Sequence, residues 1–200
     1  MRKLCLLFLL IGTYCYAGEK KYTVDSPDGK IQLAIIQTDA GELTYQLSVK
    51  RKQVIDASAL GFKTEDGLTF PFRGWKMGKV TRNKVNSVWK PLWGKRAVVP
   101  DKYNEMKLSF VNEAKSSDAL EVVARAYNEG VAFRYVSPQD AGFALELTTF
   151  NFAGDYTAWF YNGERHNIGP ERLTETDGER LPVMTVKAAD DLYLACLLYT

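Results

Sequence analysis

The sequence predicts an all-β fold of the sandwich type, for three reasons. Apolar and polar residues alternate in several short runs, a pattern that buries one face of an antiparallel strand and leaves the other in water. Turn motifs separate these runs, and no stretch has the spacing of a convincing amphipathic helix. No internal repeat or linker occurs in the 200 residues. Residues 18–200 are therefore interpreted as one domain.

The segment before this domain, residues 1–17, has the features of a secretory signal peptide. It begins with basic residues, continues with an apolar run over residues 4–11, and ends in the small residue Ala17. The run is shorter than the about 20 residues that span a bilayer. A lipoprotein signal through Cys15 is disfavoured, because the bulky Tyr14 precedes that cysteine. We therefore expect export to the periplasm and no membrane span.

The alternating runs identify the strands in chain order. Clear alternation covers residues 31–35 and 43–49, and shorter runs follow at residues 108–110, 120–122 and 131–135. Gly, Asp, Asn and Pro cluster between the runs, as is typical of turns. Turns are predicted at residues 27–29, 39–41, 65–67, 128–130 and 177–178.

Three segments depart from this pattern. Residues 72–104 contain three of the four tryptophans with little alternation, and residues 159–178 are polar. Long irregular segments in a sandwich often form functional surface, and sometimes only cover an edge. Residues 192–199 are apolar at nearly every position, which predicts a strand buried on both faces. Because such a strand ends the chain, we expect the sandwich to be incomplete at its C-terminus.

Charge and the scarcity of two residue types exclude several classes of function. Without residues 1–17, 24 basic side chains balance 24 acidic ones, so nothing favours nucleic acid or an anionic membrane as a partner. Cys196 is then the only cysteine, which excludes an internal disulfide and leaves stability to a hydrophobic core. His166 is the sole histidine, so zinc sites with several His or Cys ligands are excluded. No G-x-S-x-G motif of a serine hydrolase is present.

Five segments carry a more specific pattern. In chain order they are Ser26-Pro27-Asp28-Gly29-Lys30, Trp89-Lys90-Pro91-Leu92-Trp93-Gly94, Tyr103-Asn104-Glu105, the run RAYNEGVAFRY at 125–135 and the run FNFAGDYTAW at 150–159. Taken together, they resemble the N-terminal domain of glycoside hydrolase family 97. The resemblance extends over most of the chain after residue 17.

This resemblance implies both a fold and a setting. Members of the family are exported enzymes with an N-terminal β-super-sandwich of two large antiparallel sheets, like that of galactose mutarotase. A (β/α)₈ barrel and a small C-terminal β domain follow it. They hydrolyse α-glucosidic or α-galactosidic bonds, and the barrel carries the catalytic carboxylates. The resemblance therefore implies a domain that packs on a barrel and shapes the pocket for an oligosaccharide or α-glycoside. No catalytic residue is assigned here, and the chain alone is expected to be inactive.

The resemblance also implies calcium in the active site, with one ligand from the N-terminal domain. That ligand is a glutamate in the irregular segment after the Ala-Trp motif, and Glu164 is our candidate. Glu171 is the second choice, and the alternative for either is an ordinary solvated loop acid. Calcium takes six to eight oxygen ligands in adaptable geometry, so a loop carboxylate suits it.

Four residues near this segment are candidates for sugar binding. Trp159 could border the pocket and stack on a sugar, although packing in the core is favoured for a large aromatic residue. His166 could bond a sugar hydroxyl or a catalytic carboxylate, although a lone loop histidine is more often exposed or structural. Asn162 and Asn167 are candidate partners of sugar hydroxyls, with the same alternative.

Five other residues receive mainly structural interpretations. Trp89 and Trp93 are expected to pack either against the barrel or in the core. Asp155 is expected to cap a turn rather than to bind a metal. Arg134 and Glu105 are each expected to form a structural ion pair.

Two functions of other classes remain open from the sequence. The first is a free-standing carbohydrate-binding module that uses Trp89, Trp93 and Trp159 as a stacking platform. The second is a non-catalytic structural or adhesion domain, which would bind neither sugar nor calcium.

Overall fold

The fold is known from a computed structural model, which describes most of the domain. The described residues are 19–67, 69–71, 75–113, 119–137, 142–161, 167–176, 178 and 181–197. They form strands and a single 3-10 turn, η1 (Leu173–Glu175), so the all-β prediction is confirmed. No helix in this part is long and apolar enough to cross a membrane. The predicted signal peptide, residues 1–17, lies outside the described residues.

The first sheet is an antiparallel meander with the order β1-β2-β3-β4. Its strands are β1 (Lys20–Asp25), β2 (Ile31–Gln37), β3 (Leu43–Val49) and β4 (Lys52–Leu60). In β3, buried residues alternate with half-buried ones, as the sequence predicts. Gly41 has a φ of 86° in the turn between β2 and β3, a backbone conformation that favours glycine. Both of the clearly alternating runs are thus strands of this sheet.

The second sheet is also antiparallel, with the order β10-β9-β8-β7. Its strands are β7 (Trp75–Trp89), β8 (Val99–Asn112), β9 (Ala119–Ala126) and β10 (Val131–Val136). The prediction that residues 72–104 are irregular is wrong for β7, a strand of 15 residues. Among the described strands β7 pairs only with β8, at the edge of the sheet, and most of its residues are exposed. Because little of it faces the core, it needs no apolar alternation.

Two smaller sheets complete the described fold, with the orders β11-β5-β6 and β13-β12-β14-β15. Much of the segment 159–178, which the sequence left irregular, belongs to strands of the fourth sheet. β12 and β13 each have a register shift where they pair, which removes a regular polar and apolar period. The strands are β5 (Phe62–Thr64), β6 (Thr69–Phe70), β11 (Phe143–Glu146), β12 (Thr157–Tyr161), β13 (Asn167–Arg172), β14 (Leu181–Ala189) and β15 (Leu192–Cys196).

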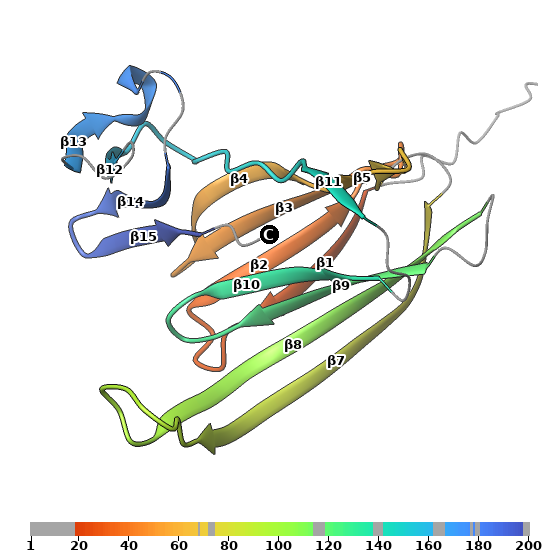
Figure 1. The fold of residues 1–200 in the computed structure, drawn as a ribbon, viewed down its shortest axis with the longest axis horizontal. Helices are drawn as coiled ribbons and strands as arrows, with labels where there is room; N and C mark the ends of the chain where they lie inside the picture. The colour runs from red at the N-terminus through yellow and green to blue at the C-terminus, as the bar shows by residue number, and fades with distance from the viewer. Residues whose placement is uncertain are drawn as a thin grey trace, which may run out of the picture.

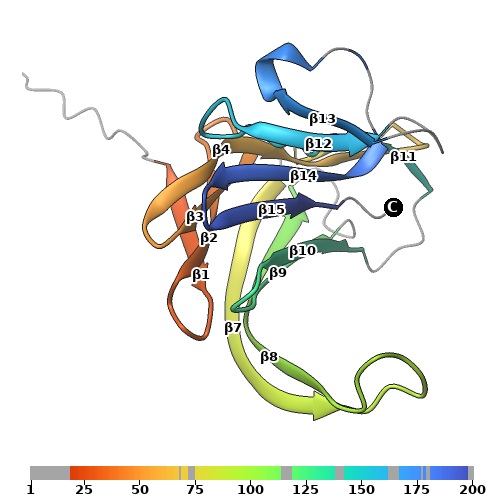
Figure 2. The same cartoon turned by 90° about the vertical axis from the view of Figure 1, so that its left-hand side faces the viewer.

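The main core lies between the first and second sheets, which form the two layers of a sandwich (Figures 1 and 2). Leu33 and Ile35 of β2 and Leu108 and Phe110 of β8 are each fully buried in one apolar cluster. A second, smaller cluster lies in the fourth sheet around Phe160. The sandwich class is therefore confirmed, with the strands divided among four hydrogen-bonded sheets.

β15 differs from the prediction for residues 192–199. Its sequence is apolar on both faces, but in the structure Tyr193 is 55% exposed and Leu197, just after the strand, is 65% exposed. β15 forms one edge of the fourth sheet, and no described strand pairs with its outer side. The expected burial on both faces is wrong for the described chain, because the face that carries Tyr193 and Leu197 is exposed while the alternate residues are half-buried.

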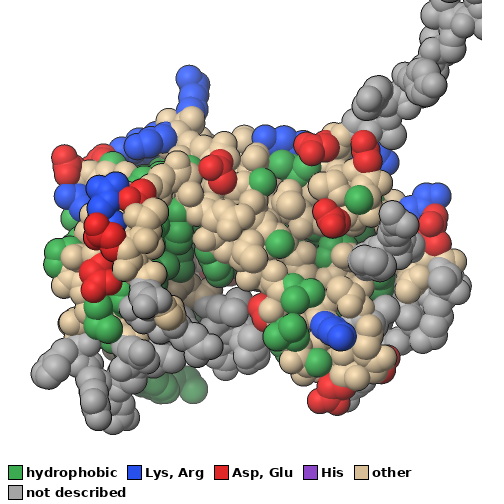
Figure 3. Space-filling model, turned by 90° about the horizontal axis from the view of Figure 1, so that it is seen from above, with side chains coloured by type: hydrophobic (Ala, Val, Ile, Leu, Met, Phe, Trp, Pro, Cys, Tyr) green, Lys and Arg blue, Asp and Glu red, His purple; other side chains and the backbone are tan. Residues whose placement is uncertain are grey.

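Charged side chains are interspersed over the surface. Figure 3 shows acidic and basic groups next to one another on the face viewed from above, without an extended area of one sign among the coloured residues. This distribution agrees with the near-neutral balance of charges in residues 18–200. A concentrated basic face, which nucleic-acid binding requires, is not seen there.

Candidate functional site

β12 carries Trp159, the first of the predicted sugar-binding residues. Its side chain is half-buried, and its ring centroid lies 6.4 Å from that of Tyr193 on β15. Trp159 is outside both buried clusters, so the core position favoured from the sequence is wrong. The half-exposed pair of rings leaves an aromatic surface on the fourth sheet, where a sugar could stack.

β13 contains two further candidates. Asn167 is its first residue, is exposed, and lies opposite Tyr161 of β12 in the sheet register. Glu171 is half-buried and lies opposite Ala158. Asn162, Glu164 and His166 lie outside the described residues, between these two strands. Because Tyr161 and Asn167 are paired, both ends of that segment are fixed at the same end of the β12–β13 hairpin.

Asp155 fastens the chain just before β12 to η1. Its carboxylate accepts hydrogen bonds from Arg172 Nε at 2.6 Å, the Thr174 backbone N–H at 3.0 Å and Thr174 Oγ1 at 2.9 Å. The backbone hydrogen bond from Thr174 is the main cause that lowers the pKa of Asp155. These bonds occupy the carboxylate with protein donors. Asp155 thus joins two segments that are distant in the sequence, and its predicted capping of a local turn stays a prediction.

The donor set of the described residues does not form a complete metal site. They contain no group of three or more His, Cys, Asp or Glu side chains that could hold an ion. Calcium needs six to eight oxygen ligands. The described residues therefore do not by themselves supply the ligand set of a calcium ion.

The end of the β7–β8 hairpin, residues 88–98, forms an exposed apolar surface that we name the hairpin end. Leu92 is fully exposed and Trp93 is 87% exposed. Trp89 is 54% exposed, and Val88 and Val98 are also exposed. Trp89 and Trp93 therefore do not pack in the core of the described chain. Exposed large apolar side chains that lie close together are typical of surfaces that contact a partner.

The three tryptophans proposed as one stacking platform are not brought together. Trp89 and Trp93 belong to the hairpin end, whereas Trp159 belongs to β12. In Figures 1 and 2, β12 lies near the top of the molecule and the end of the β7–β8 hairpin lies at the bottom.

Two of the sequence motifs meet on neighbouring strands. Glu105 of β8 is buried and accepts a hydrogen bond from Arg125 Nε of β9 at 2.8 Å. The Arg125 guanidinium lies 4.3 Å from the ring centroid of Tyr103, which contacts Tyr127 at a centroid distance of 5.0 Å. The ion pair predicted for Glu105 is confirmed. Its partner Arg125 could have been found from the sequence, since both residues belong to strands and motifs.

Burial and the neighbouring groups shift the pKa of Arg125 in opposite directions. Burial would lower the pKa of Arg125, but the hydrogen bond to Glu105 and the nearby tyrosines raise it overall. Burial also raises the pKa of Tyr103. Arg134, in contrast, is exposed and forms no ion pair within the described part of the chain, so the pair predicted for it is not found there.

Known proteins with similar sequences are glycoside hydrolases. The chain is 23% identical to a retaining alpha-galactosidase of Bacteroides thetaiotaomicron over 90% of its own length and 29% of the relative's. It is 29% identical to a probable retaining alpha-galactosidase of Streptomyces bingchenggensis over 80% of this chain and 26% of that protein. The chain thus spans less than a third of the length of either relative.

Solved structures and a family model also match this chain to glycoside hydrolases. A Glycoside Hydrolase Family 97 enzyme from Pseudoalteromonas sp. strain K8, in complex with panose, superposes with a TM-score of 0.62 and 34% identity. The match covers 70% of this chain and 22% of that enzyme. A beta-arabinopyranosidase matches with the same TM-score, 26% identity and the same coverage. The family model described as Glycosyl-hydrolase 97 N-terminal matches residues 24–195. The chain therefore belongs to the Glycosyl-hydrolase 97 N-terminal family.

Proposed function

We propose that this chain is the N-terminal domain of an exported α-glycoside hydrolase. In that enzyme it packs on a catalytic barrel and shapes the pocket for an oligosaccharide or α-glycoside. The observation that carries the proposal is the family match over residues 24–195, together with relatives that are alpha-galactosidases and three to four times as long. The reacting carboxylates then belong to the barrel, and the isolated chain has no hydrolase activity.

The hairpin end supplies the proposed contact with the barrel. Leu92 and Trp93 expose nearly all of their side-chain surface, and basic residues such as Lys90 and Arg96 lie beside them. An aromatic and aliphatic surface with a charged rim has the composition of a protein–protein interface. We therefore expect that substitution of Trp93 lowers the free energy of unfolding of the full-length enzyme far more than that of the isolated domain.

The hairpin formed by β12 and β13 supplies the proposed rim of the pocket. Trp159 and Asn167 are available at its surface for stacking and hydrogen bonding to a sugar. Glu164 donates one calcium ligand from the segment between the two strands, and His166 and Asn162 contact sugar hydroxyls there. The resemblance to family members supports these roles, as does the pairing of Tyr161 with Asn167 that fixes the ends of the segment.

Calcium binding by the full-length polypeptide tests the role of Glu164. Loss of an outer-shell partner typically weakens metal binding by about tenfold or more. We expect Glu164→Gln, which removes a direct ligand, to raise the calcium dissociation constant measured by calorimetry by at least this factor. Glu171→Gln is the matched control and should leave binding unchanged. Equal calcium affinity of the wild-type and Glu164→Gln proteins would remove Glu164 from the ligand set. Weaker binding by Glu171→Gln alone would move the role to Glu171.

A free-standing carbohydrate-binding module is the second candidate, and the exposure of Trp89 and Trp93 favours it. It predicts saturable binding of maltooligosaccharides by the isolated chain, lost in Trp93→Ala. The domain of a hydrolase predicts instead that sugar binding requires the barrel. Calorimetry of the isolated chain with maltooligosaccharides distinguishes the two. Binding of neither sugar nor calcium by the full-length polypeptide would favour a structural or adhesion domain.

A further inference from the structure

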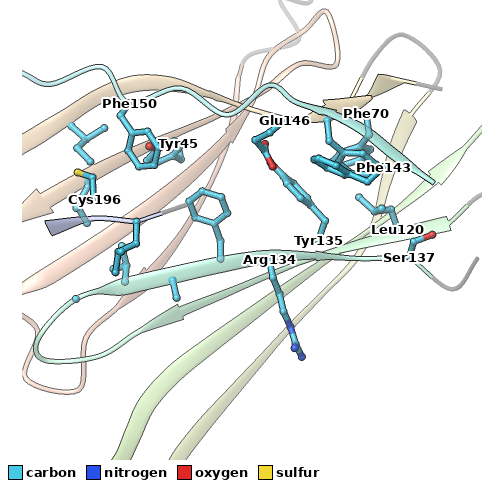
Figure 4. Close-up of a pocket in the computed structure, with 18 of the residues that line it drawn as sticks. Tyr45, Phe70, Leu120, Arg134, Tyr135, Ser137, Phe143, Glu146, Phe150 and Cys196 are labelled. Carbon is cyan, nitrogen blue, oxygen red and sulfur yellow. The ribbon is translucent and has the colours of Figure 1, made fainter. Parts of the chain in front are cut away.

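The hollows of the described fold differ in the chemistry of their walls. One, of about 800 Å³, lies between the two layers of the sandwich. Figure 4 shows Tyr45 and Phe150 projecting into it from one side and Tyr135 from the other. The Tyr45 hydroxyl donates to the Thr149 carbonyl at 2.8 Å, and the hydroxyls of Tyr135 and Thr148 lie 3.1 Å apart. These aromatic walls therefore have their hydroxyls already bonded within the protein.

A second hollow is polar and lies between β1 with the turn that follows it and the strands β7 and β8, and we name it the β1–β7 groove (Figure 2). Its volume is about 740 Å³. Nη1 of Arg82 donates to the Thr23 carbonyl, and Nδ2 of Asn104 donates to the Asp25 carbonyl, each at 2.7 Å. These bonds join the two walls of the groove. They also hold the Arg82 and Asn104 side chains in place before any ligand binds.

Three basic side chains belong to the face of the β7–β8 hairpin that is turned to β1. Arg82 lies opposite the buried Met106 in the strand register, and Lys84 lies opposite Asn104, so both are on the face that also carries the core. Lys102, two residues before Asn104, is on the same face. None of the three cations forms an ion pair with a described residue. Like charges this close on one face repel, and a bound anion would relieve that repulsion.

The two acidic residues that line the groove are engaged with other partners. Oδ1 of Asp25 accepts a hydrogen bond from Gln32 Nε2 at 2.8 Å. The Glu105 carboxylate lies 2.8 Å from Arg125 Nε and 3.9 Å from Lys107 Nζ, on neighbouring positions of the second sheet. Neither carboxylate forms an ion pair with a basic side chain of the groove. The groove therefore presents an uncompensated positive charge.

The size and the polar groups of the groove suit a sugar that carries an acidic group better than a bare ion. Its volume lies within the about 300–1,000 Å³ that is typical of small-molecule sites. Arg82 has five N–H donors, of which the Thr23 carbonyl takes one, and its planar guanidinium matches a carboxylate. The Asn104 side-chain oxygen accepts no hydrogen bond from a described residue, so it can accept one from a sugar hydroxyl.

We propose that the β1–β7 groove binds an acidic saccharide. Arg82 and Lys84 hold the carboxylate of a uronic acid residue, and Asn104 bonds its hydroxyls. The choice of a saccharide over other anions rests on the proposed function, under which the polypeptide acts on carbohydrate. No residue of the β12–β13 hairpin lines the groove, so this site and the proposed sugar-binding residues of that hairpin are different surfaces.

Hydrogen exchange of the native full-length polypeptide tests this assignment, because it locates the bound ligand. The probes are digalacturonate and its neutral counterpart, α-1,4-galactobiose. At a digalacturonate concentration about ten times the dissociation constant, we expect the amides of residues 23–29 to exchange about tenfold more slowly. Galactobiose at the same concentration should not slow them, and the amides of β13 should not respond to digalacturonate. Absence of protection at residues 23–29, or equal protection by galactobiose, would overturn the proposal.

Substitution of one lysine of the groove gives a second measurement. Loss of a hydrogen bond to a charged group weakens binding by about tenfold or more. We therefore expect Lys84→Met to raise the digalacturonate concentration for half-maximal protection by at least this factor. Lys79→Met is the matched control, because Lys79 is also an exposed lysine of β7 but does not line the groove. An equal effect of the two substitutions, or no effect of Lys84→Met, would contradict the assignment.

Inorganic sulfate distinguishes a saccharide site from a site for any small anion. We expect sulfate to protect residues 23–29 only at concentrations at least about tenfold higher than digalacturonate, because it lacks the hydroxyls that bond to Asn104. Protection by sulfate at the same concentration as digalacturonate would show that the groove takes an adventitious ion only, and would overturn the proposal.

The same samples separate this inference from the proposed function. A full-length protein that hydrolyses an α-glycoside but shows no protection of residues 23–29 by digalacturonate refutes the groove site alone. Specific protection by digalacturonate in a folded full-length protein without hydrolase activity refutes the proposed function alone.

Discussion

The buried Glu105 and the half-buried Arg125 form an ion pair across two central strands, with 2.8 Å between the carboxylate and Nε. Glu105 is only 6% exposed, and Lys107 lies at 3.9 Å from its other carboxylate oxygen. A buried carboxylate that loses its partner retains the cost of its burial without the compensating interaction. Removal of Arg125 should therefore cost more than removal of a partner from a fully exposed pair.

Removal of the Arg125 guanidinium should destabilise the domain. We expect Arg125→Met to lower the free energy of unfolding by about 1–3 kcal/mol, because Glu105 would be buried without its hydrogen-bond donor. Urea denaturation measures the change. Lys107→Met is the control and should cost less than about 1 kcal/mol, since that pair is longer and Lys107 is more exposed. Equal costs for the two variants would contradict this account.

Substitution of Trp75, in β7, and substitution of Trp93, in the hairpin end, should differ sharply in their effect on stability. Trp75 is 6% exposed and packs edge-on against Phe70 at a centroid distance of 5.1 Å, whereas Trp93 is 87% exposed. We expect Trp75→Ala to cost about 3–5 kcal/mol in the free energy of unfolding of the isolated domain. Trp93→Ala should change it by less than about 0.5 kcal/mol. A large loss in Trp93→Ala would show that the hairpin end packs within this domain.

The turn between β1 and β2 should give a stability that depends on pH. Asp28 accepts a hydrogen bond from Ser26 Oγ at 2.6 Å, and its pKa is lowered to about 2 by this bond and by those from Lys30. A lowered pKa in the folded state stabilises the fold above the unfolded value of about 4, and this contribution is lost as pH falls from about 4 towards 2.

Comparison of Asp28→Asn with the wild-type protein isolates this contribution. The urea midpoints should differ most at pH 6 to 7 and converge as pH falls below about 4. Asp39→Asn, in the next turn, is the control, because Asp39 forms no ion pair or side-chain hydrogen bond within the described chain. A difference between Asp28→Asn and the wild type that persists unchanged at pH 2 to 3 would refute the effect.

The close approach of β4, β5 and β6 predicts a further destabilising change. A Cβ at Gly61 would lie 2.5 Å from the Phe70 carbonyl oxygen, so the backbone would have to move. We expect Gly61→Ala to cost about 1–3 kcal/mol. A Cβ at Gly130, in the turn between β9 and β10, meets nothing within 4 Å. Gly130→Ala should be neutral or slightly stabilising in thermal unfolding, and a larger loss there than at Gly61 would contradict this interpretation.

The sequence predicted the core strands whose buried residues alternate regularly, but not β4, where two buried residues are consecutive. Residues 43–49 alternate because β3 lies between two neighbours with one face buried, and they match the observed strand. It missed β7 and β13, which lie at sheet edges and bury little apolar surface, so that solvent relaxes the choice of side chain. Periodicity reports burial rather than hydrogen bonding. Edge strands held mainly by backbone pairing therefore leave little trace in the sequence.

The arrangement of the candidate-site residues was harder to predict from the sequence than the fold. The bonds of Asp155 to Arg172 and Thr174 join residues far apart in the sequence, which a local turn motif does not predict. The pairing of Trp159 with Tyr193 depends on how β12 and β15 are arranged in the fourth sheet, which local sequence does not specify. The exposure of Trp93 likewise depends on the length of the β7–β8 hairpin, which extends beyond the core.

The central claim is that this domain belongs to a hydrolase whose bond-breaking residues lie elsewhere in the polypeptide. Release of nitrophenol from p-nitrophenyl α-glucoside and α-galactoside, with calcium, tests it most directly. The account predicts turnover of at least one substrate by the full-length polypeptide and none by residues 18–200. Reproducible hydrolysis by the isolated domain, or failure of the folded full-length polypeptide to cleave any α-glycoside, would contradict it.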